Sequence, residues 1–155
     1  MAIRKIVKIG DSILRKKSRP VEKFDSRLHM LLDDMKDTLY QANGVGLAAV
    51  QVGTLRRVVV MDCGDGYIEL VNPEIIEKDG EQFEEEACLS LPGEFGVTAR
   101  PAMVKVKAQD RNGKWCVYKC EELKARCFCH EIDHLDGIVF TDRVIKDYEK
   151  AEDSE

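Results

Sequence analysis

The first pattern along the chain is a helical repeat of apolar residues between positions 25 and 41. Five apolar side chains recur at intervals of three or four residues and therefore share one helix face: Leu28, Leu31, Leu32, Met35 and Leu39. Asp25 precedes this run and has the side chain of an N-cap residue. Asn43 and Gly44 interrupt the repeat. The sequence therefore predicts an amphipathic helix over about 25–41, near the N-terminus.

Short runs typical of β-strands follow, separated by turn residues. They cover residues 57–61, 67–71, 75–77, 82–84, 103–108 and 115–120. Asp79-Gly80 and Asn112-Gly113 are dipeptides of the kind that closes β-hairpins. A second helix is predicted over about 121–136, because acidic residues occupy its first turn and Gly137 lies just past its end.

Composition and charge narrow the function classes. The 155 residues suit one domain, and 44% apolar with 34% charged residues is typical of a globular chain. A net charge of −5 without a basic block argues against nucleic-acid binding. No apolar run approaches the roughly 20 residues of a membrane span, and the first residues do not resemble a signal peptide. We therefore expect six free or metal-binding cysteines in a reducing cytoplasm.

The second predicted helix contains the sequence His130-Glu131-Ile132-Asp133-His134. Histidines at positions i and i+4 lie on one helix face, so both imidazoles can reach one metal ion. Glu131 is offset around the helix and can reach a water on that metal without binding the metal itself. The same pattern also arises by chance in helices whose histidines are solvated or packed in a core.

A catalytic metal site of this kind needs a third protein ligand. His29, the one remaining histidine, lies beside the apolar face of the first predicted helix and is expected to be solvated. About 18 residues follow Gly137, and they contain no histidine. The third ligand is therefore expected upstream, and the thiolate of Cys88, in a segment interpreted as a loop, is the best candidate. The alternative is a structural zinc site made of Cys116, Cys120, Cys127 and Cys129, although its spacing lacks the usual pair of CxxC knuckles.

A third feature is the glycine-rich segment over residues 44–51, with the sequence GVGLAAVQ. It lacks the Lys-Ser/Thr of a P-loop and the glycine spacing of a dinucleotide-binding motif. A turn that lets a substrate backbone approach closely is the better physical interpretation. Gln51 at its end offers an amide donor.

Three segments together resemble the signature motifs of the peptide deformylase family. They are residues 44–51 (GVGLAAVQ), 86–90 (EACLS) and 130–134 (HEIDH), and they match in order and approximate spacing. The resemblance extends from about Ile6 to Val144. It implies a hydrolase that removes the N-terminal formyl group from formyl-methionine of newly synthesised proteins, with nascent peptides near the ribosome exit as partners and no membrane.

The resemblance also implies roles for individual residues. A divalent metal, natively Fe²⁺ in the family and replaceable by Zn²⁺, Ni²⁺ or Co²⁺, would be held by Cys88, His130 and His134. Glu131 would act as general base and then acid, and the Leu89 backbone N–H and the Gln51 amide would stabilise the oxyanion. Residues expected to contact the substrate are Gly44, Val45, Gly46, Arg100 and Cys127.

The pattern and the resemblance together predict an α+β fold. We expect one catalytic domain over residues 1–155, in which antiparallel strands pack around a central metal-binding HExxH helix and the amphipathic helix lies near the N-terminus. Residues 147–155 are expected to form a charged, solvated tail.

Two positions depart from the family's motifs. Ala87 stands where the family usually has glycine, and Cys129 stands where it usually has glutamine. Neither position supplies a metal ligand or the general base, so we expect these two substitutions to modify the activity rather than abolish it. The competing interpretations are a catalytically silent module with the same fold and the structural zinc protein. An enzyme releases formate from a formyl-methionyl peptide, whereas a catalytically silent module does not.

Overall fold

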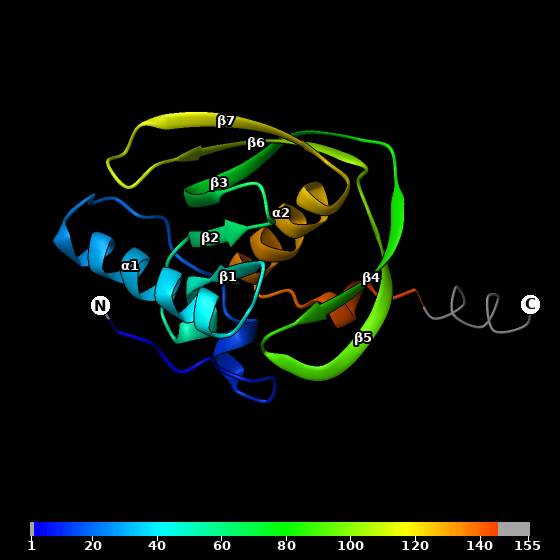
Figure 1. The fold of residues 1–155 in the computed structure, drawn as a ribbon, viewed down its shortest axis with the longest axis horizontal. Coiled ribbons are helices and arrows are strands. Elements are labelled where there is room, and N and C mark those ends of the chain that lie inside the picture. The colour runs from blue at the N-terminus through cyan, green and yellow to red at the C-terminus, as the bar shows by residue number, and fades with distance from the viewer. Residues whose placement is uncertain (1, 146–155) are drawn as a thin grey trace, which may run out of the picture.

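The computed structural model describes residues 2–145, and the charged tail expected over 147–155 lies outside them. The described residues form an α+β domain with two antiparallel sheets (Figure 1). The larger sheet has the order β1-β2-β3-β6-β7, with bounds Gly46–Ala48, Val58–Asp62, Tyr67–Asp79, Met103–Gln109 and Trp115–Glu121. The smaller is a hairpin of β4 (Gln82–Cys88) and β5 (Leu91–Arg100).

Helix α1 spans Ser26–Gln41 and covers part of the larger sheet. Asp25 caps it, because its side chain accepts a hydrogen bond of 3.1 Å from the Leu28 backbone N–H. Its buried face includes all five apolar residues of the repeat, which pack against Leu47, Val58 and Val60 of β1 and β2. Burial of this apolar face stabilises the helix more than its intrinsic propensity does.

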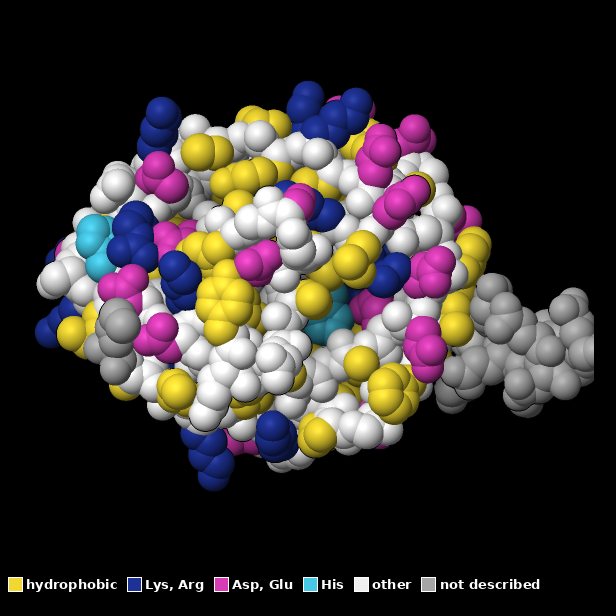
Figure 2. Space-filling model, in the orientation of Figure 1, with side chains coloured by type: hydrophobic (Ala, Val, Ile, Leu, Met, Phe, Trp, Pro, Cys, Tyr) yellow, Lys and Arg dark blue, Asp and Glu magenta, His cyan; other side chains and the backbone are white. Residues whose placement is uncertain are grey.

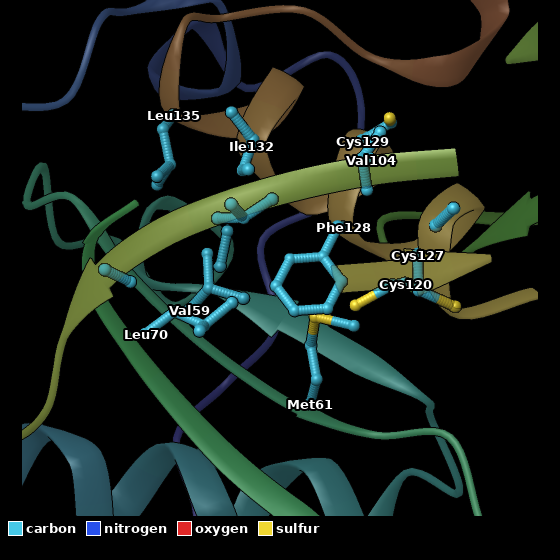
Figure 3. Packing of buried hydrophobic residues seen from close by; sticks show 14 of the residues in the cluster. Val59, Met61, Leu70, Val104, Cys120, Cys127, Phe128, Cys129, Ile132 and Leu135 are labelled. Atoms are coloured by element: carbon cyan, nitrogen blue, oxygen red, sulfur yellow. The ribbon is translucent and has the colours of Figure 1, made fainter. Parts of the chain in front are cut away.

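Helix α2, Glu122–Leu135, lies between the larger sheet and the β4–β5 hairpin (Figure 1). Figure 3 shows Phe128 of this helix packed among side chains of the sheet, including Val59, Met61 and Leu70. The face with Phe128 is thus anchored in the core. The rotation of the helix is fixed by this packing, which directs its histidines toward the hairpin.

Three short 3₁₀ turns complete the described chain: Ser12–Arg15, Ala49–Val52 and Phe140–Arg143. The segment before the first turn is held on the body of the protein by backbone hydrogen bonds. Val7 donates to the Gln51 carbonyl at 2.7 Å, and Ile9 donates to the Ser90 carbonyl at 2.8 Å. Of the helices described, none is both long and apolar enough to span a membrane.

The structure corrects three predictions about local structure. The segment around Cys88, predicted as a loop, is the end of β4 and the start of β5. Asp79-Gly80 does not close a hairpin, because β3 pairs with β6 and β4 pairs with β5, so this turn joins the two sheets. The glycine-rich turn passes directly into the short strand β1. The hairpin predicted at Asn112-Gly113 is confirmed between β6 and β7.

Candidate active site

Three side chains with metal-binding atoms meet where the hairpin faces α2. Cys88 ends β4, and His130 and His134 lie one turn apart on α2. Their donor atoms all lie within 4.8 Å of one another, and Cys88 Sγ is 3.3 Å from His134 Nε2. Two imidazoles and one thiol form a ligand set for a divalent transition metal, so these residues fit such an ion.

Cys88 lies next to an irregularity in the pairing of the hairpin. The pairing of β4 with β5 shifts between Glu86 and Cys88, so that Cys88 lies opposite Leu91. Such a bulge bends a strand and redirects its side chains. Cys88 faces the two histidines on the same side of the hairpin as Glu86, whose Oε1 lies 2.9 Å from His130 Nδ1.

Glu86 fixes the orientation of the His130 imidazole through its Nδ1 atom. His130 Nδ1 donates to Glu86 Oε1 at 2.9 Å, which leaves Nε2 directed toward Cys88 and His134. The Thr98 hydroxyl also donates to Glu86. Burial would raise the pKa of Glu86, but hydrogen bonds from His130 and Arg100 outweigh it and lower the pKa to about 2. Glu86 is therefore an ionised acceptor that orients this imidazole.

Arg100 occupies a different place from the one predicted. Its side chain is 3% exposed and does not line the pocket described below. Its guanidinium donates to both Glu86 oxygens, at 2.8 and 3.0 Å, and to Asp133 Oδ2 at 2.6 Å. Because this guanidinium is buried and donates three hydrogen bonds within the protein, we assign Arg100 to the support of Glu86 rather than to substrate contact.

Glu131 lies beside the three donor atoms with an unsatisfied oxygen. It is 4% exposed, its Oε2 is 3.9 Å from His130 Nε2, and its Oε1 is buried without a hydrogen-bond partner. Burial raises the pKa of Glu131 to about 7. An unpaired buried carboxyl oxygen is costly and is characteristic of groups that meet their partner only when a substrate or water is bound.

Gly46 in β1 lies against Glu131. A Cβ atom at this position would be 2.6 Å from Glu131 Oε2 and 2.8 Å from its Cγ. Any side chain here would displace the carboxylate. This close approach, rather than a positive φ, explains the glycine at position 46.

The Gln51 amide is fixed at the same point. It is 1% exposed, and its Oε1 accepts a hydrogen bond of 2.9 Å from the Ala48 backbone N–H. Its Nε2 donates to Ser90 Oγ at 3.1 Å and lies 3.6 Å from Cys88 Sγ. The orientation of the amide is therefore set, with its NH₂ group toward the candidate ligands. Leu89 follows Cys88 directly and lines the same pocket.

These groups form the floor and walls of a pocket of about 350 Å³. The predicted residues Gly44, Val45 and Cys127 line it, together with Leu123 and Arg126 of α2, which the sequence did not suggest. Figure 2 shows a hollow in the surface with a histidine side chain at its bottom and an acidic side chain beside it. The pocket thus gives a peptide-sized ligand access to Glu131 and the candidate metal ligands.

The other predicted metal interpretation is not supported. Among residues 2–145, Cys88, His130 and His134 are the one group of three or more side chains placed to hold a metal ion. The structural zinc site from the remaining cysteines is therefore absent from this part of the chain. His29, expected to be solvated, is half-buried, and its Nε2 hydrogen-bonds to the Arg111 carbonyl at 2.8 Å.

A Cys-His-His ligand set beside a buried, unpaired carboxyl group at the floor of a pocket defines a metallohydrolase type of site. Residues 3–150 match the polypeptide deformylase family, and the chain belongs to it. The chain is 58% identical to the peptide deformylase of Alkaliphilus metalliredigens over 147 residues, which are 95% of this chain and 100% of that protein. It is 60% identical to the peptide deformylase of Caldicellulosiruptor bescii, over 94% of this chain and 88% of that protein.

Solved structures show the same fold. The peptide deformylase of Thermotoga maritima superimposes with a TM-score of 0.92 at 42% identity, covering 94% of this chain and 99% of that chain. The enzyme from Legionella pneumophila gives a TM-score of 0.90 at 42% identity, with 99% of both chains covered. The predicted family and the predicted α+β domain of antiparallel strands are thereby confirmed.

Proposed function

We propose that the protein removes the N-terminal formyl group from formyl-methionine of newly synthesised proteins, by metal-dependent hydrolysis in the pocket above Cys88, His130 and His134. Membership of the deformylase family supports the reaction. The observation that carries the site assignment is the convergence of these three donors within 4.8 Å, with an unpaired Glu131 oxygen beside them.

Cys88, His130 and His134 would hold the metal, and Glu86 would keep His130 oriented through its Nδ1. When bound, a divalent ion supplies Lewis-acid polarisation of the formyl carbonyl and lowers the pKa of a water molecule. This ligand set leaves room for a small molecule on the pocket side, where Glu131 and the Gln51 amide lie.

Glu131 is assigned both proton transfers. Its buried oxygen would accept a proton from the attacking water and then deliver that proton to the departing amine of the methionine. A pKa of about 7 suits a carboxyl group that must take up and release a proton near neutral pH. Gly46 leaves the space that the Glu131 carboxylate occupies, because a Cβ at this position would lie 2.6 Å from its Oε2.

The developing negative charge on the formyl oxygen needs hydrogen-bond donors fixed in advance. The Gln51 NH₂ group is held by Ala48 and Ser90 and faces Cys88, so it requires little rearrangement to donate. The backbone N–H of Leu89, the residue next to Cys88, is the second proposed donor.

The pocket also suggests how a formyl group is distinguished from a larger acyl group. A formyl carbon carries only hydrogen, whereas an acetyl carbon carries a methyl group. The space beside Glu131 is limited by Gly46, Gln51 and Leu89, all of which line the pocket. We therefore propose that Gly44, Val45 and Gly46 flank the peptide, that Cys127 borders the methionine side chain, and that the acetyl methyl is excluded by crowding.

We propose Fe²⁺ as the metal. A thiolate donates more charge than an imidazole or a carboxylate, and Cys88 therefore makes this ligand set softer than that of a His₂Glu zinc site. Such a set also accepts Zn²⁺, Ni²⁺ and Co²⁺, so substitution by these ions is part of the proposal. We place the protein in the cytoplasm and its substrates at the ribosome exit, where formylated nascent chains first become accessible.

The test compares formyl-Met-Ala-Ser with acetyl-Met-Ala-Ser on protein loaded with iron under anaerobic conditions, and on nickel- and zinc-loaded samples. Formate should be released from the first peptide, and the acetyl peptide should be essentially spared. Exposure to air should inactivate the iron sample but not the nickel sample, because Fe²⁺ is readily oxidised. Equal rates of hydrolysis of the two peptides would indicate a general aminoacylase instead. If no sample released formate, the protein would be a catalytically silent module with the same fold.

A further inference from the structure

A series of ion pairs leads from the surface of the protein to His130. Arg143 donates from Nε to Asp133 Oδ2 at 2.6 Å and from Nη2 to Asp133 Oδ1 at 3.0 Å. Asp133 Oδ2 also accepts from Arg100 at 2.6 Å, and Arg100 donates to both oxygens of Glu86. Glu86 in turn accepts from His130 Nδ1. Alternating cations and anions therefore connect Arg143 to one of the proposed metal ligands.

Burial increases along this series. The side chain of Arg143 is 43% exposed and that of Asp133 is 15% exposed, whereas Arg100 and Glu86 are almost fully buried. Removing the partner of a buried ion leaves an uncompensated charge, which is strongly destabilising. Because Arg143 is the exposed member, water can partly replace it. Its removal is therefore the change in this series that is most compatible with folding.

The turn that carries Arg143 is held against the same part of the site. It spans Phe140–Arg143, and the Phe140 ring stacks on the His130 imidazole, with ring centroids 6.1 Å apart and planes inclined by 23°. Just beyond the turn, the Ile145 backbone N–H donates to the Val97 carbonyl of β5 at 2.8 Å. Arg143 therefore extends from a backbone that is fixed relative to both α2 and the hairpin.

Arg143 sets the direction of the Asp133 carboxylate. A guanidinium binds a carboxylate through two parallel N–H donors, which fixes the plane of the carboxylate as well as its position. Because Arg143 holds both oxygens, Asp133 Oδ2 stays directed at Arg100. A lysine could hold the carboxylate as a point charge but could not fix its plane in this way.

We propose that Arg143 is a positioning residue of the metal site, because it orients Asp133 and thereby keeps Arg100 and Glu86 in the arrangement that fixes His130. The inference rests on the proposed function, since His130 is a metal ligand only in that proposal. Arg143 does not line the substrate pocket, so it acts through the other members of the series. Residues behind a metal-binding histidine typically contribute about 10- to 100-fold to metal affinity. We expect the low end, about tenfold, because Arg143 acts indirectly.

The test measures zinc affinity by competition with a chromophoric chelator, on wild type, Arg143→Ala, Arg143→Lys and Arg57→Ala. Arg57 is the matched control, because it binds Asp136 at the end of α2 at 2.9 Å and lies outside the series. Zinc affinity should fall about tenfold in Arg143→Ala and less in Arg143→Lys, and it should keep the wild-type value in Arg57→Ala. The free energy of unfolding of the metal-free proteins, measured in urea, should fall similarly in both alanine variants, so lost stability alone does not explain lost affinity.

Two further measurements distinguish positioning from a general structural role. The visible absorption spectrum of the cobalt-loaded protein reports the geometry around the ion. It should change in Arg143→Ala but not in Arg57→Ala. Because the effect is proposed to pass through Glu86, adding Arg143→Ala to Glu86→Gln should lower zinc affinity by less than about twofold further.

Zinc affinity and cobalt spectra of Arg143→Ala that match those of wild type would overturn the inference. A further loss of about tenfold on top of Glu86→Gln would also overturn it, because Arg143 would then act independently of Glu86. If Arg143→Ala does not fold, wild-type affinity in Arg143→Lys would contradict the proposed orientation of Asp133. A wild-type protein that binds zinc but releases no formate from formyl-Met-Ala-Ser would contradict the proposed function and leave this inference standing.

Discussion

Glu131 is the residue on which the proposed proton transfers depend. Replacing it with glutamine preserves its size but removes the proton acceptor from a position that is 4% exposed. We expect Glu131→Gln to bind metal normally and to lose at least about 10²-fold in kcat, the low end for general acid–base catalysis. Formate release and metal content, measured on the same samples, check this. Near-normal turnover in the variant would remove Glu131 from the mechanism.

At this scale the sequence predicted the residues that carry a recognisable chemical pattern. His130 and His134 could be paired from helical spacing alone, and Cys88 followed as the best remaining donor. Glu86 was missed, although it lies two residues before Cys88, because its role depends on a contact with His130 across 44 positions. Arg100 was assigned to the substrate from the family resemblance, and its pairing with Glu86 and Asp133 could not be read from the sequence.

The departure at Ala87 also becomes clear in the structure. The non-glycine residues with positive φ in the described chain are Asn43, Asn72 and Glu122, and Ala87 is not among them. Alanine therefore fits this position without backbone strain. Cys129 is buried on α2 and lies outside the substrate pocket, so its replacement of glutamine affects the packing behind His130 rather than the pocket.

At the scale of elements, Glu69 of β3 is part of a hydrogen-bond network that links the larger sheet to helix α1. Arg111 donates to Glu69 Oε1 and Oε2 at 2.8 and 2.7 Å and also to Asp33 of α1 at 2.9 Å. The Tyr67 hydroxyl donates to Glu69 at 2.8 Å. Burial would raise the pKa of Glu69, but the hydrogen bonds from Arg111 and Tyr67 outweigh it and lower the pKa.

Because the folded state lowers this pKa, ionised Glu69 stabilises the fold above its unfolded pKa, and that contribution is lost as pH falls through the folded pKa. Glu69→Gln should therefore lower the free energy of unfolding by about 1 kcal/mol at pH 7. The difference from wild type should shrink near pH 3. Thermal or urea unfolding at both pH values measures this.

Glu74→Gln on the same strand is the matched control. Glu74 lies 3.7 Å from Lys107 in an exposed ion pair, so its replacement should change stability by only a few tenths of a kcal/mol. A difference between Glu69→Gln and wild type that is equal at pH 7 and pH 3 would show that the ionised carboxylate is not the cause.

Strands were predicted well where apolar and polar residues alternate and poorly where they do not. In β5, Pro92, Gly93 and Gly96 conceal the strand pattern. The structure explains Gly96, since a Cβ there would be 2.5 Å from Val144 Cγ2 in a segment 48 residues later. In β3, Asn72 has positive φ within a bulge and is held by Val21 and Gln109, so two predicted strands are one.

At the scale of the whole molecule, the site is assembled from distant parts of the chain. The N-terminal segment binds the backbones of Gln51 and Ser90, the hairpin supplies Cys88, and α2 supplies both histidines. Each part is weakly specified by its own sequence, and their convergence is fixed by the packing of α2 between the sheet and the hairpin (Figure 1). This explains why three separate motifs together indicated the family when no single motif did.

In the proposed mechanism, Cys88, His130 and His134 together hold the metal on which deformylation depends. The most direct measurement is metal content per chain and formate release, determined on the same anaerobic, iron-loaded samples of wild type, Cys88→Ser and Cys116→Ser. We predict that wild type and Cys116→Ser bind one ion per chain and release formate from formyl-Met-Ala-Ser, whereas Cys88→Ser loses both properties. Full activity with unchanged metal content in Cys88→Ser would show that Cys88 is not a ligand of the metal.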